Sequence, residues 1–186
     1  MVTIDLITGF MGSGKTTFLK KYAEYLMDQG LHIGILENDF GAINVDMLML
    51  HELRGDQCEL EMIAGGCDAE SHRRRFRTRL ISMRMCGYAR VLVEPSGIYD
   101  VDEFFDELRE EPLDQWYEIG NVITILDARL EDNLSEQADY LLASEAANAG
   151  KVILSHADAA TREQSEDTVA HLNRAQDQIR CDRCID

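Results

Sequence analysis

A run of glycines beside one lysine and two threonines is the part of this sequence best suited to chemistry. Residues 9–17 read Gly-Phe-Met-Gly-Ser-Gly-Lys-Thr-Thr, follow an apolar run at 2–7 and precede a helical pattern. The spacing matches the phosphate-binding loop G-x-x-x-x-G-K-[S/T], whose backbone amides surround an anion at the start of a helix. The sequence therefore predicts that the ligand is a nucleoside triphosphate.

Each residue type in this loop has its own expected role. The glycines permit backbone conformations that a Cβ atom would forbid, so several N–H groups can point at one anion. Lys15 is expected to reach the β- and γ-phosphates as a catalytic residue, and the Thr16 hydroxyl is expected to hold Mg²⁺. Thr17 could also be only a polar residue of the first helical turn. The residues expected at the nucleotide are Gly9, Gly12, Ser13, Gly14, Lys15, Thr16 and Thr17.

A candidate acidic residue follows a later apolar run. Residues 91–97 read Val-Leu-Val-Glu-Pro-Ser-Gly, so Glu94 lies where a strand is expected to end. Open α/β sheets bind ligands at this edge, and an acid there orients Mg²⁺ or its waters. We therefore expect Glu94 to be catalytic and to hold magnesium, with a solvated strand-end Glu as the alternative. Gly97 either supplies an amide that senses the γ-phosphate or forms a turn.

The segment after the second apolar run gathers more polar groups. Residues 37–41 read Glu-Asn-Asp-Phe-Gly and are expected at the same edge of the sheet. Glu37 and Asp39 are candidates for positioning a nucleophilic water or a metal, and the segment could form a mobile loop. A plain polar loop would have a similar sequence.

Composition limits the class of protein. The 186 residues fit one domain, expected at 1–160, followed by a helical or frayed tail at 161–186 and no second domain. The formal net charge of −17 argues against nucleic acid or an anionic membrane as a partner. Five cysteines, an odd number, do not indicate a disulfide framework, which favours a cytoplasmic location.

The pattern of apolar runs predicts the fold class. Continuous runs of Val, Ile and Leu alternate with stretches of helical length, which indicates an α/β fold. We expect a doubly wound, mostly parallel sheet with helices on both faces, in three layers. Strands are predicted at 2–7, 33–36, 58–63, 91–93, 122–126 and 152–154, and helices at 15–29, 71–86, 101–109, 131–147 and 161–178.

Taken together, these segments resemble the CobW/HypB/UreG family of P-loop GTPases, and its CobW-like members most. The matching pieces are residues 9–17, 37–41, Gly-Gly-Cys at 65–67, Glu-Pro-Ser-Gly at 94–97 and Val-Ile-Thr-Ile-Leu-Asp-Ala at 122–128. The resemblance covers about residues 1–158, the nucleotide-binding domain only. It implies a slow GTPase, with GTP/GDP and Mg²⁺ bound, that couples the nucleotide state to metal delivery or to maturation of cobalamin or a metalloenzyme client. It also implies a Walker B role for Glu94 and a switch region at 37–41.

This chain has fewer cysteines than the family usually carries in its metal-binding motif. Members of the family usually carry Cys-x-Cys-Cys after the glycine, whereas this chain reads Cys67-Asp68-Ala69-Glu70. The resemblance implies a site for Zn²⁺ or another transition metal built from Cys67, Glu37 and Glu70. Cys58 or His72 could compensate for the lost thiols. A single buried cysteine without metal is the alternative.

The expected base-recognition segment is altered as well. The family uses [Asn/Thr]-Lys-x-Asp after a late strand, and here residues 155–158 read Ser-His-Ala-Asp. Asp158 takes the position of the guanine-binding aspartate, whose carboxylate accepts N1–H and the exocyclic amine that adenine lacks. His156 replaces the lysine and could stack on the base, and Ser155 replaces the amide. Guanine preference is the resulting hypothesis.

Two charged or thiol-bearing segments have other readings. Residues 72–79 read His-Arg-Arg-Arg-Phe-Arg-Thr-Arg and could be a solvated helix face, could pair with acidic neighbours or a partner, or could close over phosphates. Cys181 and Cys184 form one C-x-x-C pair, which supplies two zinc ligands, so a full site would need a second pair from another subunit of a homo-oligomer. A frayed tail is the simpler reading.

Two other functions stay open at the level of sequence. A P-loop small-molecule kinase would need an acceptor pocket with a base near the γ-phosphate. A nucleotide-binding regulator without useful catalysis is allowed by the altered thiol and base segments.

Overall fold

A parallel sheet forms the centre of the computed structural model, which describes residues 1–10, 12–39, 45–64, 69–95, 101–130 and 133–185. Six parallel strands lie in the order β3-β2-β4-β1-β5-β6. They coincide with the six predicted strands, so the expected sheet is confirmed. The strands are β1 (Val2–Thr8), β2 (Ile33–Asp39), β3 (Cys58–Ala64), β4 (Arg90–Pro95), β5 (Tyr117–Asp127) and β6 (Lys151–Ser155).

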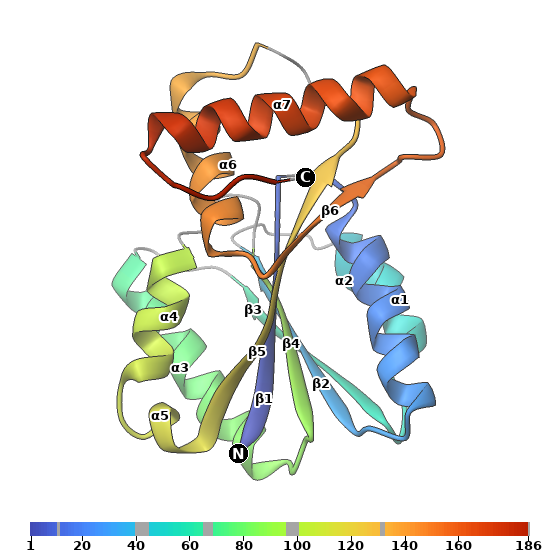
Figure 1. The fold of residues 1–186 in the computed structure, drawn as a ribbon. Coiled ribbons are helices and arrows are strands. Elements are labelled where there is room, and N and C mark those ends of the chain that lie inside the picture. The colour runs from blue at the N-terminus through green and yellow to red at the C-terminus, as the bar shows by residue number, and fades with distance from the viewer. Residues whose placement is uncertain (11, 40–44, 65–68, 96–100, 131–132, 186) are drawn as a thin grey trace.

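Helices cover both faces of the sheet (Figure 1). One face carries α1 (Lys15–Asp28), α2 (Val45–Leu50) and the 3₁₀ helix η1 (His51–Leu53). The other carries α3 (Ala69–Met85), α4 (Val101–Arg109) and α5 (Leu113–Trp116). The buried side chains divide in the same way, with Leu19, Ile35 and Leu92 in one cluster and Phe76, Val93 and Phe104 in the other. The predicted three-layer α/β fold is therefore confirmed.

The last two helices lie together at the end of the sheet opposite the N-terminus (Figure 1). They are α6 (Glu136–Asn148) and α7 (Arg162–Gln178), and they share an apolar cluster that includes Leu142 and Leu172. The segment after α7 packs back on this cluster, because Asn173 exchanges two 2.9 Å hydrogen bonds with the backbone of Ile185. The predicted domain boundary at residue 160 remains a prediction.

Several element boundaries differ from the prediction for local reasons. Helix α6 begins at Glu136 rather than 131, because the Ser135 hydroxyl accepts the Ala138 amide as an N-cap. Helix α7 begins after Thr161, which forms a capping box with Gln164. The short elements α2, η1 and α5 were not predicted, since segments of three to six residues have too little periodicity to recognise.

Strand β5 begins five residues earlier than the predicted start, at Tyr117 instead of residue 122. Its first half is largely exposed, so it lacks the continuous apolar run by which the other strands are recognised. A register shift between Ile4 and Leu6 accommodates it on β1. Asp5, buried at this irregularity, accepts a 2.6 Å hydrogen bond from the Asn121 amide.

The basic run on α3 is tied to acidic residues. Arg73 forms an ion pair with Glu107 of α4, and Arg77 pairs with Glu110. Phe76 points into the core, as predicted. Of the interpretations of this run, pairing with acidic neighbours therefore fits the structure better than a solvated helix face. None of the helices within the described ranges is long and apolar enough to cross a bilayer.

Candidate functional site

The loop between β1 and α1 requires glycine at specific positions. Gly9 has a φ of 135°, and a Cβ atom there would lie 2.1 Å from the backbone oxygen of Ile125 on β5. Gly14 is in the left-handed conformation, with a φ of 86°, and forms the N-cap of α1. These conformations favour glycine, so the loop is both tightly curved and pressed against the neighbouring strand.

Lys15 lies over this loop. Its side chain is 8% exposed, and Nζ donates a 3.0 Å hydrogen bond to the Phe10 carbonyl, which also accepts the Ser13 amide at 3.1 Å. A buried ammonium is costly unless it has partners of this kind. The positive charge is therefore held at the start of α1, where the positive end of the helix dipole adds to it.

Thr16 and Glu94 meet behind the loop. The Thr16 hydroxyl donates a 2.9 Å hydrogen bond to Glu94 Oε1, and both side chains are buried. The contact joins the first turn of α1 to the carboxyl end of β4. Hydroxyl and carboxylate oxygens are the hard ligands that Mg²⁺ prefers, so these two residues fit the ion that was predicted for them.

Glu37 lies next to Glu94 at the same sheet edge. The two residues are paired in register on the parallel strands β2 and β4, so they project from the same face, and Glu37 is 3% exposed. Asp39 ends β2 and pairs with Ala64 through the backbone of β3. The remaining predicted switch residues, Phe40 and Gly41, lie outside the described residues, as does Gly97.

The predicted base segment lies beside the phosphate loop. An added Cβ on Gly14 would be 3.5 Å from Ser155 Cβ and 3.8 Å from His156 Cε1. His156 has a φ of 52° and approaches Asp127 Oδ2 with its Nδ1 at 2.9 Å. Asp158 is exposed and acts electrostatically on Arg129. Ser155 and His156, two of the residues that were predicted at the base, therefore lie at the end of β6 close to the start of α1, and Asp158 follows them in the chain.

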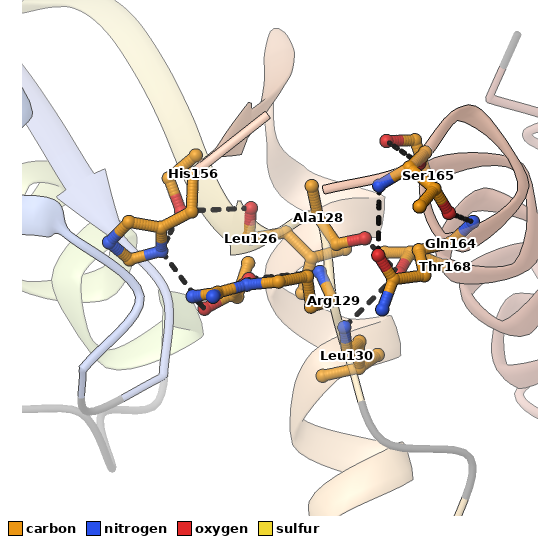
Figure 2. A network of polar contacts seen from close by, with 11 residues as sticks. Leu126, Ala128, Arg129, Leu130, His156, Gln164, Ser165 and Thr168 are labelled. Atoms are coloured by element: carbon orange, nitrogen blue, oxygen red, sulfur yellow. Dashed lines mark hydrogen bonds and ion pairs between the residues drawn. The ribbon is translucent and has the colours of Figure 1, made fainter. Parts of the chain in front are cut away.

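Asp127, at the end of β5, organises this region and was not predicted as a site residue. Arg129 contacts Asp127 through both its backbone and its side chain, and His156 contacts it through Nδ1. Figure 2 shows Arg129 and His156 close to each other. Burial acts to raise the pKa of Asp127, but hydrogen bonds from Arg129 and His156 hold that pKa below its ordinary value. Its position at the carboxyl end of a strand was the available signal, the same one that identified Glu94.

The start of α7 is joined to the same region. The Thr168 hydroxyl donates to the Ala128 carbonyl at 3.0 Å and accepts the Leu130 amide at 3.2 Å, as Figure 2 shows. Thr168 is 1% exposed. Helix α7 therefore fixes the backbone that immediately follows Asp127 and carries Arg129.

Glu145, on α6, is a second residue that sequence reasoning missed. It is 2% exposed, and burial raises the pKa of its carboxyl to about 7, against the opposing effects of Thr8, Lys15 and the Gly9 amide. Its neighbours show that it lies against the phosphate loop, although it is distant in sequence. A glutamate within a helix gives no sequence signal of such a contact.

The predicted transition-metal residues are only partly visible. Cys67 lies outside the described residues, Glu70 is exposed in the first turn of α3, and Glu37 lies at the sheet edge. Cys58 begins β3, at the opposite edge of the sheet from the phosphate loop, and burial raises its pKa to about 11, so it does not compensate. Burial also lowers the pKa of His72. Within the described ranges, no cluster of three His, Cys, Asp or Glu side chains could hold a metal ion.

The parallel sheet, the glycine loop and the Thr16–Glu94 contact define a P-loop NTPase fold. The family model for "CobW/HypB/UreG, nucleotide-binding domain" matches residues 3–183, and the chain belongs to this family. The resemblance inferred from the sequence is thereby confirmed.

Curated relatives agree with this assignment, and solved structures agree with the fold. The zinc chaperones YjiA and YeiR of Escherichia coli K12 are 28% and 26% identical over 92% and 89% of this chain. Those matches take in 55% and 50% of the relatives, so the chain spans about half of their length. Among solved structures, Zn(II)-bound YjiA GTPase from E. coli aligns over 92% of this chain and 54% of its own, with a TM-score of 0.56 and 20% identity. The hydrogenase maturation factor HypB from Archaeoglobus fulgidus aligns over 94% of this chain and 76% of its own, with a TM-score of 0.58 and 18% identity.

Proposed function

We propose that this chain binds Mg²⁺–GTP in the loop at 9–17 and hydrolyses it slowly to GDP and phosphate. The observation that carries this proposal is the buried contact of Thr16 with Glu94 beside Lys15, because it joins the two oxygen ligands expected for magnesium at the phosphate site. Membership of a family of nucleotide-binding domains supports the same ligand class.

The residues then divide the work of phosphoryl transfer. The Lys15 ammonium leaves its hydrogen bond to the Phe10 carbonyl and contacts the phosphates instead. There it stabilises the charge that develops on the transferring phosphoryl group. Thr16 and Glu94 hold the magnesium that accompanies the nucleotide. Glu37, beside Glu94, orients the attacking water, so the bond between the β–γ bridging oxygen and the γ-phosphorus breaks as the water oxygen bonds to phosphorus.

We infer a guanine preference from the end of β6. Asp158 is exposed and available to two donors of the base, and His156 lies within reach of Gly14 in the phosphate loop. The Asp127 carboxylate holds the His156 ring at 2.9 Å and so fixes one wall for the base. A carboxylate that pairs with guanine leaves adenine with unmatched groups, which is the physical basis of the preference.

We further propose that the nucleotide state is coupled to delivery of a metal to a client metalloprotein in the cytoplasm. The relatives YjiA and YeiR are zinc chaperones, which supports a metal as cargo. Cysteines 58, 86, 181 and 184 are free thiols, in keeping with a reducing compartment. In this proposal Cys67 and Glu37 handle the metal, with Glu70 as a further ligand.

The decisive experiment compares phosphate release from GTP by the wild-type protein and by Lys15→Ala. Removing the ammonium is expected to reduce turnover by about 100-fold or more while the circular dichroism spectrum is unchanged. Lys21→Ala is the matched control, because Lys21 lies exposed on the same helix. Unchanged hydrolysis in Lys15→Ala would overturn the proposed function.

A further inference from the structure

The carboxyl group of Glu145 is built into the back of the phosphate loop. The Thr8 hydroxyl and the Gly9 amide face it from the end of β1, and Lys15 acts on it as a positive charge from α1. On β5, Thr124 donates a 3.1 Å hydrogen bond to the backbone carbonyl of Glu145. That bond fixes this turn of α6 against the sheet, so the backbone that carries the Glu145 side chain is held beside the loop.

Three buried polar atoms around this position are unsatisfied. Glu145 Oε2, Thr8 Oγ1 and Ser13 Oγ make no hydrogen bond of ordinary geometry within the part of the chain that the structure describes, although the Thr8 hydroxyl faces the Glu145 carboxyl closely enough to lower its pKa. Buried polar atoms without partners are costly, and a group of them beside a ligand loop indicates that a partner arrives with the ligand. A protonated Glu145 carboxyl can donate a hydrogen bond to an incoming phosphate oxygen, as the two hydroxyls can, whereas the ionised carboxylate can only accept one.

Electrostatic interactions also favour a protonated Glu145 carboxyl when a polyphosphate is bound. An ionised Glu145 offsets part of the positive charge of Lys15 and repels a polyphosphate in the loop, whereas a neutral carboxyl does neither. Burial raises the pKa of Glu145 to about 7, so both forms are populated near neutral pH. The other charged groups packed against α6 have partners of their own: His171 of α7 pairs with Asp139 of α6, Glu107 of α4 pairs with Arg73, and Arg183 donates to the Ala146 carbonyl at 3.0 Å.

We propose that Glu145 is a positioning residue of the phosphate loop, and that the protein takes up a proton at this carboxyl when it binds the nucleotide. The inference rests on the proposed function, because it requires a polyphosphate in the loop. In both states a carboxyl oxygen accepts the Gly9 amide and holds the loop. The proton comes from solvent and returns to solvent when the nucleotide leaves, and no bond of the nucleotide changes.

The test is titration calorimetry of the whole chain with Mg²⁺ and a non-hydrolysable GTP analogue, in pairs of buffers that differ in ionisation heat. Between about pH 6 and about pH 8, the wild-type Kd is expected to rise by up to about tenfold, with net proton uptake near neutral pH. Glu145→Gln keeps an oxygen for the Gly9 amide but does not ionise, so it is expected to lose this pH dependence and the proton uptake. Glu136→Gln removes an exposed carboxylate of the same helix and is expected to behave as wild type.

The outcomes separate this inference from the proposed function. Protonation of the analogue itself is common to the three proteins and cancels in the comparison. If Glu145→Gln keeps the wild-type pH dependence, or if the wild type takes up no proton, the role of Glu145 is wrong while nucleotide binding stands. If no protein binds the analogue at any pH, the proposed function fails together with this inference. If Glu145→Gln does not fold, the proton uptake of the wild-type protein, compared with that of Glu136→Gln, tests the role of Glu145 by itself.

Discussion

The Thr16 hydroxyl donates a hydrogen bond to the Glu94 carboxylate across 2.9 Å, although the two residues are 78 positions apart in the chain. The bond ties the first turn of α1 to the end of β4 and is buried. In this arrangement an incoming magnesium ion finds a hydroxyl and a carboxylate already side by side. Preorganisation of this kind lowers the cost of assembling the site when the nucleotide binds.

Replacing Thr16 by Val removes the hydroxyl and keeps the side-chain shape. We expect the affinity for Mg²⁺–GTP to fall by at least about tenfold, because a magnesium ligand and the partner of Glu94 are both lost. Thr16→Ser should restore most of the affinity, and Thr78→Val, at an exposed position on α3, should have little effect. Fluorescent-nucleotide binding with and without magnesium measures this. An unaltered affinity in Thr16→Val would contradict the role given to Thr16.

Glu94→Gln tests the charge at the end of β4 without changing its volume. The amide retains an acceptor for Thr16 but is a poorer ligand for a hard cation, so GTP turnover should fall by about tenfold to 100-fold. Binding of GDP in the absence of magnesium should be nearly unchanged, since that contact depends on the loop amides and Lys15. Single-turnover hydrolysis and magnesium titrations provide the readout. A turnover equal to wild type would remove Glu94 from the magnesium site.

The ends of the strands were largely predictable from the sequence, because continuous apolar runs mark strands that are covered on both faces. That reasoning placed Glu94 and Glu37 at one edge of the sheet, and the phosphate-loop motif assigned Thr16 to the same magnesium ion as Glu94. Asp127 obeys the same rule and could have been found with it. The resemblance to the family added the expected position of Asp158.

Contacts made by helix side chains across the fold were not predictable in this way. Glu145 reaches the phosphate loop from the middle of α6, and nothing in the local sequence of that helix indicates its depth. The ion pairs of Arg73 and Arg77 depend equally on how α4 packs beside α3. Periodicity specifies which face of a helix is apolar, whereas the partner of a polar side chain depends on tertiary packing.

Asp158→Asn tests the proposed recognition of guanine. An amide cannot accept two hydrogen bonds from the base as the carboxylate can, so GTP affinity should fall by about tenfold to 100-fold while ATP affinity changes little. Asp56→Asn is the control, because it removes an exposed carboxylate elsewhere. Competition binding with both nucleotides measures the ratio. Equal losses for GTP and ATP would reject base recognition through Asp158.

The raised pKa of Glu145 also predicts a pH dependence of stability without nucleotide. The carboxyl has a pKa of 4.5 in its ordinary state and about 7 in the folded protein, so between these values the folded form binds more protons than the unfolded chain. Stability is therefore expected to fall as the pH rises through this window, by about 3 kcal/mol in total. Glu145→Gln should lack this loss, as urea denaturation at both ends of the window would reveal. A parallel pH profile in the variant would contradict the burial argument.

Gly9 is expected to be the least replaceable glycine of the loop. An alanine there would place Cβ 2.1 Å from the Ile125 carbonyl oxygen, so Gly9→Ala should lower the free energy of unfolding by about 3 kcal/mol or more. Gly87→Ala has a positive φ of 78° as well, but no atom lies within 4 Å of the added Cβ, so it should cost only about 1 kcal/mol. Thermal and chemical denaturation of both variants provide the comparison. Similar losses in the free energy of unfolding for the two variants would show that the contact with the Ile125 carbonyl oxygen is not what requires glycine at position 9.

Titration calorimetry of the wild-type chain with Mg²⁺–GTP, and separately with Mg²⁺–ATP, tests the central claim most directly. We expect saturable binding of one nucleotide per chain, tighter for GTP, which disappears in Lys15→Ala. Folded protein that binds neither triphosphate would contradict the claim that the loop at 9–17 is a phosphate site.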